Sequence, residues 1–268
     1  MILGEDMKIK RLLTISLVSM LCSASLIAQE HAPKHSTKKI VQKSQKVQHT
    51  QKSATEILMN SYRYIESLKH FQIKATVLSE DVYRQSTIMQ WTHHVLIDVK
   101  RPSKMFIDIS GDVKNQKIYL ENGLFTIYSK RHNMYGQLKT KNSIDETLDM
   151  LFENYDIKAP LANLIYSDIS TRLKPKKEGY VFGEVTYKGT KCDYIGFDTK
   201  TKGFQIWIQQ GDKPLIKKFV IIDKTTKEHL RSTTMLKWNL HPFAFFDMYK
   251  FKAPKDAAKI DILPYEKD

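Results

Sequence analysis

The chain has 268 residues, of which 27% are charged and 41% are hydrophobic, an ordinary composition for a globular protein with a sizeable core. The formal net charge is +14, which favours an anionic partner but does not choose among nucleic acid, anionic lipid and an acidic protein. Two cysteines are present, Cys22 and Cys192, so a disulfide-rich scaffold is not expected.

The first 28 residues have the three-part pattern of a secretory signal. A basic region, MKIKR, starts at Met7 and is followed by an apolar run that ends in small residues at Ala28. Met7 is an alternative start, because two acids precede it. We expect a cleavable signal peptide over residues 1–28. An uncleaved membrane anchor is a weaker alternative, because the run is short for a span. Lipidation of Cys22 is also weaker, because no small residue stands just before it.

Residues 29–53 are rich in Lys, Gln, Ser and His and contain almost no apolar residues. A segment of this composition cannot bury enough surface to order itself, so we interpret it as a basic flexible tether. The folded part then begins with a capping box, in which Ser53 is followed three residues later by Glu56. Apolar residues from Ile57 to Leu68 share one helical face and predict an amphipathic helix.

From Phe71 onward the hydrophobic period changes from that of a helix to two, the period of a strand. The run Met89–Val99 alternates most clearly, and Met105–Ile109 continues the pattern after an interruption at Arg101-Pro102. Asn122-Gly123 lies between two strand-like runs and predicts a tight hairpin. A further strand is expected at Met134–Leu138.

A helical block then interrupts the strands. It begins with a second capping box, Ser143 and Glu146, and continues after Pro160 as one or two short helices. Strands return after Gly179, and a last short strand is expected at Met248–Phe251. The later strands are Tyr180–Tyr187, Cys192–Asp198, Phe204–Gln209, Leu215–Asp223 and Leu230–Trp238.

The connections between these strands are short, so neighbouring strands should be antiparallel. No mid-chain linker is present, and we therefore expect one α+β domain over residues 54–268. A single antiparallel sheet of this size must curl. The expected fold is a strongly curved sheet or unclosed β-barrel, with helices covering its mouth.

Signatures of catalysis and of metal binding are absent from the sequence. It contains no HExxH, CxxC or GxSxG pattern, and the adjacent His93 and His94 would point to opposite faces of a strand. We therefore expect no enzyme activity, no metal site and no cofactor. Nucleic acid is not expected as a partner either, because an exported protein meets little of it.

The segment VKRPSKMFIDI resembles the strand–KRP–strand element of the bacterial lipoprotein-localisation carriers, the periplasmic chaperone LolA and its outer-membrane receptor LolB. The segments IESLKHFQIKATV, ENGLFTIYS and YKFKAPKDAAKID extend the resemblance in order. The chain is still more similar to a family of predicted periplasmic proteins of unknown function in the same fold superfamily. DMLFENYDIKAPLANLIYSD, YKGTKCDYIGF and FQIWIQQGDKPLIKKFVI carry that similarity, which covers nearly all of residues 54–268.

The resemblance implies an unclosed barrel whose apolar interior accepts acyl chains beneath a helical lid. In the carriers the arginine of KRP bonds to that lid, and Arg101 is the residue that matches it. A plain ion pair at the rim is the alternative reading of Arg101. We therefore expect a monomeric periplasmic carrier of a lipid or another hydrophobic ligand. The candidate ligand-binding residues are Arg101, Trp91, Phe106, Phe125, Leu148, Phe152, Trp207 and Phe219.

A half-closed barrel of this size tends to leave room for a ligand, but ordinary core packing is the better explanation for any single one of its aromatic residues. The second hypothesis is therefore a structural or adaptor protein of the cell envelope with a filled barrel. That protein would bind an envelope protein, or an anionic membrane surface, on its exterior.

Overall fold

The computed structural model describes residues 52–84, 87–159, 161–243, 245 and 247–265. The signal peptide expected at residues 1–28 and the tether up to residue 51 lie outside the described residues, so both stay predictions. Among the described residues, no helix is both long and apolar enough to cross a membrane.

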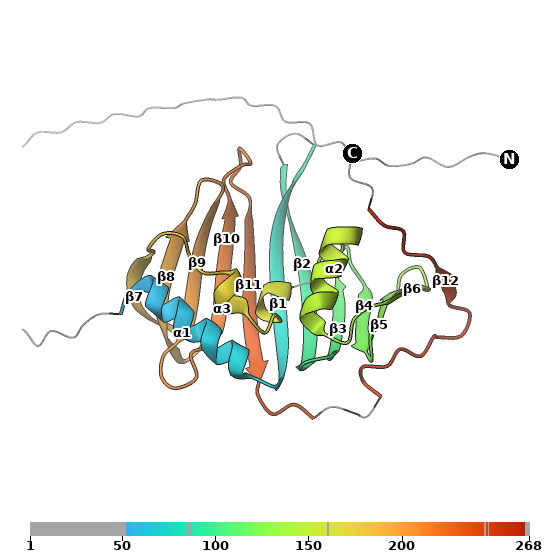
Figure 1. Cartoon of the computed structure of the whole chain (residues 1–268). Coiled ribbons are helices and arrows are strands. Elements are labelled where there is room, and N and C mark those ends of the chain that lie inside the picture. Colours follow the sequence, from blue (N-terminus) through green and yellow to red (C-terminus); the bar gives the residue numbers. More distant parts are fainter. Residues whose placement is uncertain (1–51, 85–86, 160, 244, 246, 266–268) are drawn as a thin grey trace, which may run out of the picture. The chain divides into compact units, whose positions relative to one another are not determined.

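One twelve-stranded sheet dominates the described structure (Figure 1). Its order is β12-β6-β5-β4-β3-β2-β1-β11-β10-β9-β8-β7, and β12 and β7 do not pair with each other, so the barrel is unclosed as expected. The strands are β1 (His70–Tyr83), β2 (Thr87–Lys100), β3 (Lys104–Gly111), β4 (Gln116–Glu121), β5 (Leu124–Ser129), β6 (Met134–Lys139), β7 (Tyr180–Tyr187), β8 (Thr190–Asp198), β9 (Lys202–Gln209), β10 (Ile216–Asp223), β11 (Arg231–Asn239) and β12 (Ala258–Ile260).

Neighbouring strands pair antiparallel, with one exception, the parallel pair β12–β6. The hairpin between β4 and β5 turns at Asn122 and Gly123, whose φ values of 52° and 70° are left-handed. This is the conformation that a two-residue hairpin requires, and it confirms the turn expected from the sequence.

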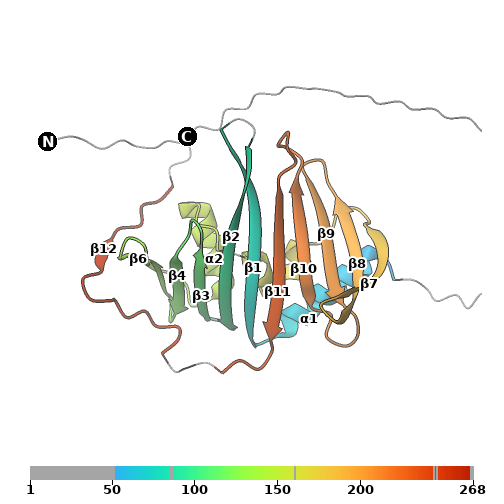
Figure 2. The same ribbon diagram turned by 180° about the vertical axis from the view of Figure 1, so that it is seen from behind.

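The helices explain how the chain crosses the sheet. After β6 near one edge, the chain forms α2 (Ile144–Tyr155), η1 (Ala162–Leu164) and α3 (Ile169–Arg172), and it re-enters the sheet at β7, the opposite edge strand. Together with α1 (Ala54–Ser67), these segments lie on one face of the sheet, and Figure 2 shows the other face from behind. We call the four segments the helical cover, the face beneath them the inner face, and the opposite face the outer face.

Both long helices begin as the capping boxes predict. The hydroxyl oxygen of Ser53 accepts a hydrogen bond from the Glu56 amide at 3.2 Å, and Ser143 does the same for Glu146 at 3.4 Å. Each side chain satisfies one of the amides that a helix leaves without an internal partner at its start.

Strand alternation places the core between the inner face and the helical cover. Phe71 lies opposite Val99, and Ile73 lies opposite Ile97, and all four are fully buried. The helices contribute buried apolar residues to the same cluster, among them Leu58, Ile65, Leu148 and Leu151. Burial of one such side chain stabilises the fold by about 1.5–3 kcal/mol, which is why helix and sheet stay together.

The chain end does not form the strand expected at Met248–Phe251. Instead, the hydroxyl of Tyr249 donates a hydrogen bond of 2.6 Å to the buried carboxylate of Asp98 on the outer face. Phe251 packs on a cluster of tyrosines, and the chain then reaches β6 as β12. Side chains thus tie this segment across the sheet, whereas a strand would have needed a free edge. The tyrosines that contact Phe251 are Tyr119, Tyr128 and Tyr135.

Candidate functional site

The rim of the sheet at the end of β2 is where the helical cover is attached. The backbone amide of Arg101 donates to the carbonyl of Lys69 at 2.9 Å, just before β1. The carbonyl of Pro102 accepts a hydrogen bond of 2.8 Å from the amide of Ile144, the first residue of α2. The Arg-Pro break therefore anchors the start of α2 and the turn between α1 and β1.

The guanidinium of Arg101 joins two further segments of the helical cover. Nη1 donates to the carbonyls of Ile65 and Leu68 at the end of α1, at 3.1 and 2.5 Å. Nη2 donates to the carbonyls of Ile165 and Tyr166, between η1 and α3, at 2.8 and 2.9 Å. A helix leaves its last carbonyls without partners, so a planar cationic fork is well matched to this place.

Burial lowers the pKa of Arg101, and the nearby carboxylates of Asp145 and Glu66 act in the opposite direction. An arginine side chain stays protonated in proteins, so the charge persists at the rim. The guanidinium carbon also lies 5.0 Å from the centre of the Phe71 ring, a distance at which cation and ring attract each other. Arg101 therefore contacts both the helical cover and the core beneath it.

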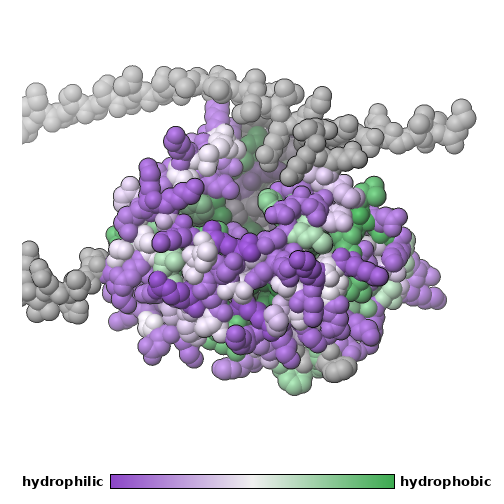
Figure 3. Space-filling view, viewed as in Figure 1, coloured by the Kyte–Doolittle hydropathy of each residue, from purple (hydrophilic) through white to green (hydrophobic). Residues whose placement is uncertain are grey.

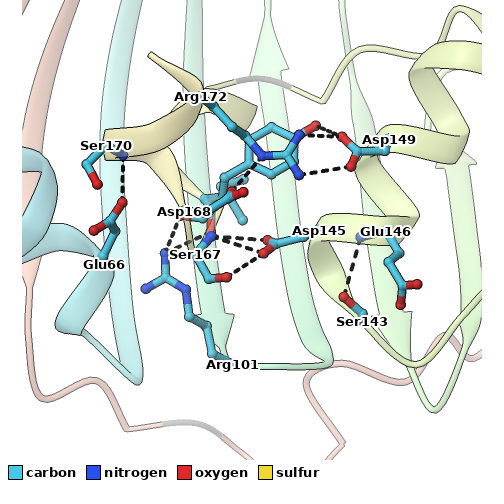
Figure 4. Close-up of polar contacts among 12 residues, drawn as sticks. Glu66, Arg101, Ser143, Asp145, Glu146, Asp149, Ser167, Asp168, Ser170 and Arg172 are labelled. Carbon is cyan, nitrogen blue, oxygen red and sulfur yellow. Dashed lines mark hydrogen bonds and ion pairs between the residues drawn. The ribbon is translucent and has the colours of Figure 1, made fainter. Parts of the chain in front are cut away.

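A second set of polar contacts links the helices to one another (Figure 4). The carboxylate of Glu66, on α1, accepts a hydrogen bond of 2.6 Å from the amide of Ser170 on α3. On α2, the carboxylate of Asp145 accepts bonds from the amide and the hydroxyl of Ser167. The three helices are thus connected by side chains that meet around Arg101.

Asp149 and Arg172 form the strongest of these links. The guanidinium of Arg172 donates two bonds to the carboxylate of Asp149, at 2.8 and 2.9 Å, and the Tyr166 hydroxyl donates a third at 2.9 Å. Burial favours a higher pKa for Asp149, but the bonds from Arg172 and Tyr166 outweigh it and lower the pKa. Burial and the bond to Asp149 raise the pKa of Tyr166. A bidentate pair of this kind fixes α3 against α2 geometrically.

The helical cover does not shield the whole inner face equally. Near Arg101 the inner face is fully buried, whereas Trp91 and Phe219, towards the other end of the strands, are half-buried. Trp91 lies opposite Ser79 of β1, and Ser79 is eight residues after Phe71 on that strand. At about 3.3 Å per residue, Trp91 is therefore roughly 26 Å along the sheet from Phe71. Figure 3 shows a hollow with hydrophobic residues at the upper end of this face.

The structure distributes the eight candidate residues over several places. Phe125 and Leu148 are buried in the core between sheet and helices. Trp91 and Phe219 lie on the inner face outside the fully buried part, and Phe152 on α2 is 55% exposed. Arg101 is at the rim, and these residues do not form one continuous ligand-contact surface.

Phe106 and Trp207 lie on the outer face, away from the helical cover. Their strand neighbours Ile107 and Ile206 are buried in the inner core, and side chains alternate between faces along a strand. Phe106 packs against Tyr119, with ring centres 5.1 Å apart. The grouping of both residues with the interior does not hold in the structure.

Several residues of this site escape sequence reasoning. The acceptors for Arg101 are backbone carbonyls, which any residue type supplies, so no residue pattern points to them. From the sequence alone, nothing distinguishes three acids of this site from ordinary exposed acids on amphipathic helices, namely Glu66, Asp145 and Asp149. Within the described residues, no group of three or more His, Cys, Asp or Glu side chains could hold a metal ion.

Comparison with known proteins identifies the family of this chain. No curated protein matches the sequence. Among solved structures, an uncharacterized conserved protein from Thermus thermophilus is 13% identical over 78% of this chain and 98% of its own, with a TM-score of 0.45. LprF from Mycobacterium bovis is 11% identical over 76% of this chain and 97% of its own, with a TM-score of 0.44.

A LolA superfamily protein from Nitrosomonas europaea is 8% identical over 75% of this chain and 99% of its own, with a TM-score of 0.33. Residues 54–263 match the model of the family described as predicted periplasmic protein (DUF2092). This match confirms the family resemblance and the periplasmic location inferred from the sequence. The chain belongs to this family of periplasmic proteins.

Proposed function

We propose that the protein is a non-catalytic, monomeric periplasmic carrier that binds a lipid, an acylated molecule or another hydrophobic ligand on the inner face of its sheet. The helical cover is the lid of this binding region, and Arg101 holds the lid closed. One observation carries the proposal. A single guanidinium joins the end of α1 to the segment before α3 through four backbone carbonyls.

The closed lid explains why the apolar interior is packed in this structure. The side chains of Leu58 and Ile65 on α1 and of Leu151 on α2 fill the space over the buried part of the inner face. An acyl chain would replace these side chains as the helices move away, so the apolar surface stays covered in both states. Such an exchange needs a weak attachment that can open, and polar contacts at a half-buried rim meet that need.

The replacement Arg101→Leu tests the lid. We expect faster amide hydrogen exchange at residues 65–68 and 164–170, and greater uptake of the apolar dye Nile red. The matched control is Arg63→Leu, because Arg63 is an exposed arginine on α1 whose one hydrogen-bond partner among the described residues is Asn60 on its own helix. If Arg101→Leu does not fold, Arg101→Lys replaces it. Unchanged exchange and unchanged dye uptake in a folded Arg101 variant would make Arg101 an ordinary rim cation.

The second function is a structural or adaptor protein of the envelope that binds a protein partner on its exterior. The tight packing beneath the cover favours it, since Phe71, Ile97 and Ile107 have no exposed surface. Native mass spectrometry of the purified protein, together with extraction of bound lipid, separates the two functions. A co-purifying hydrophobic ligand supports the carrier. A ligand-free protein that also fails to bind Nile red when Arg101 is replaced supports the adaptor.

A further inference from the structure

The outer face carries a hollow that the lid does not involve. It has a volume of about 710 Å³ and lies over β1, β2, β3, β10 and β11, between the β5–β6 turn and the β7–β8 turn. Figure 2 shows these strands from the outer side. Thr76, Leu96 and Met235 line it, and their strand neighbours Ala75, Val95 and Leu236 belong to the inner core. The hollow is therefore on the opposite face of the sheet from Arg101.

The charge of this hollow is strongly one-sided. The single acid among its lining residues is Asp108, whose carboxylate is already paired with Lys130 at 2.5 Å and lies 3.7 Å from Lys117. Five lysines against one aspartate leave a formal charge of +4. The five lysines are Lys74, Lys130, Lys188, Lys217 and Lys237.

Four of these lysines, all except Lys130, form no ion pair with any carboxylate in the described part of the chain. They come from three separate segments of the sequence, namely β1, the β7–β8 turn and the β10–β11 hairpin. Like charges around a concave surface repel one another and concentrate the positive potential there. A multiply charged anion would relieve this repulsion, whereas a neutral ligand would not.

Lys217 is placed in the hollow by an irregularity of the sheet. The pairing of β10 with β9 shifts between Ile216 and Lys218, so Lys217 is the extra residue of a bulge. A bulge changes the direction of a side chain and is often found beside functional sites. Because Lys218 instead lies 4.3 Å from the centre of the Trp207 ring, the two adjacent lysines have separate surroundings.

The remaining lining combines hydroxyl groups with an apolar floor. Thr76, Ser110 and Thr190 offer hydroxyls, and Leu96 and Met235 offer apolar surface between the lysines. Hydroxyl and ammonium groups are donors for phosphate oxygens, and the apolar floor fits carbon groups attached to the phosphates. A volume of about 710 Å³ is within the range of pockets that hold ligands of drug size.

We propose that this hollow binds a ligand that carries two or more phosphate groups on a partly apolar body. The same chemistry is found in the head group of a phosphate-bearing lipid and in a soluble polyphosphorylated molecule. A head group would enter the hollow from a membrane surface, and a soluble ligand would enter from solution. This site acts on the face opposite the lid and does not depend on the function proposed for the inner face.

Calorimetry with inorganic tripolyphosphate tests the site in low-salt buffer. We expect saturable binding of one tripolyphosphate by the unmodified protein, weakened about tenfold or more by the double replacement Lys217→Gln and Lys237→Gln. The matched control is Lys202→Gln with Lys227→Gln, which removes the same charge from exposed lysines outside the hollow and should change affinity less than about twofold. If replacing Lys217 prevents folding, Lys74→Gln takes its place.

Co-sedimentation with phosphatidylcholine vesicles, with and without cardiolipin, a lipid whose head group carries two phosphates, distinguishes the two sources. Binding to cardiolipin-containing vesicles that tripolyphosphate displaces indicates a lipid head group, and tripolyphosphate binding without vesicle binding indicates a soluble ligand. No binding of tripolyphosphate, or equal weakening in both double variants, would overturn the proposal. Nile red uptake reports on the inner face and should be unaffected by the lysine replacements, so failure of one proposal is distinguishable from failure of the other.

Discussion

Replacing Arg101 by lysine and by leucine separates charge from geometry at the rim. The guanidinium donates four hydrogen bonds, two to carbonyls of α1 and two to carbonyls before α3. A hydrogen bond from a charged group contributes about 1.5–3 kcal/mol, but the four bonds share two nitrogens at a half-buried position, so about 1 kcal/mol each is a better measure. Arg101→Leu should then lower the free energy of unfolding by about 4 kcal/mol.

Lysine keeps the charge but loses the planar fork. Its ammonium is a compact charge that can serve one pair of carbonyls at a time, so Arg101→Lys should cost about 2 kcal/mol. With a urea dependence of about 2–3 kcal/mol per molar for a domain of this size, the lysine variant should unfold about 0.7–1 M earlier. Because every 1.4 kcal/mol is a factor of ten, the population with an open lid should rise about 30-fold.

Urea unfolding followed by tryptophan fluorescence and by circular dichroism measures these differences. The order of midpoints should be arginine, lysine, leucine, with unchanged urea dependence. A leucine variant within about 0.5 kcal/mol of the unmodified protein would show that water replaces the guanidinium without cost, since surface substitutions usually stay within that limit. Equal loss in both variants would show that the fork, and not the charge, is what the helical cover requires.

Three further predictions concern the contacts around this site and on the outer face. Tyr249→Phe removes a donor from the buried Asp98 carboxylate and should cost about 1.5–3 kcal/mol in urea unfolding, with faster hydrogen exchange at 258–260. Hydrogen bonds from Arg172 and Tyr166 lower the pKa of Asp149 in the folded protein. The contribution of Asp149 to stability is therefore present above an unfolded pKa of about 3.9 and is lost as the pH falls through the folded pKa. In acid titrations of stability, Asp149→Asn should remove that dependence and an unchanged slope would contradict it. Leu148→Ala should cost about 2–5 kcal/mol because the side chain is buried, whereas Phe152→Ala, at an exposed position, should stay within about 0.5 kcal/mol; similar losses would refute the burial argument.

The local features of the fold were accessible from the sequence. Ser53 and Ser143 cap their helices, and Asn122-Gly123 turns a hairpin, because each depends on residues within a few positions of one another. Alternation along β2 correctly separated its two faces. The same alternation puts Phe106 and Trp207 on the face opposite their buried neighbours Ile107 and Ile206, whereas their aromatic character alone suggests the interior.

The final strand was predicted at the wrong place for a different reason. In residues 248–251, Lys250 stands between the aromatic residues Tyr249 and Phe251, an alternation that is typical of a strand. In the structure, Tyr249 and Phe251 instead meet Asp98 and a tyrosine cluster on the outer face, and the edge pairing comes later at β12. Alternating hydrophobicity indicates that a segment is extended and half-buried. It does not show whether that segment pairs with a neighbouring strand or packs across the face of the sheet.

The sequence by itself determined the strand and helix periods, the capping residues and the antiparallel hairpins, and its family resemblance singled out Arg101 as a candidate. Only the tertiary structure decided what surrounds these elements. β1 pairs with β11, about 160 residues later, and that pairing brings Lys74 beside Lys237 on the outer face. The acceptors of Arg101 are carbonyls from α1 and from the segment before α3, which meet because the chain crosses the sheet between its two edges. Periodicity is a local property of the chain, whereas both sites arise from contacts between distant segments, which no local pattern encodes.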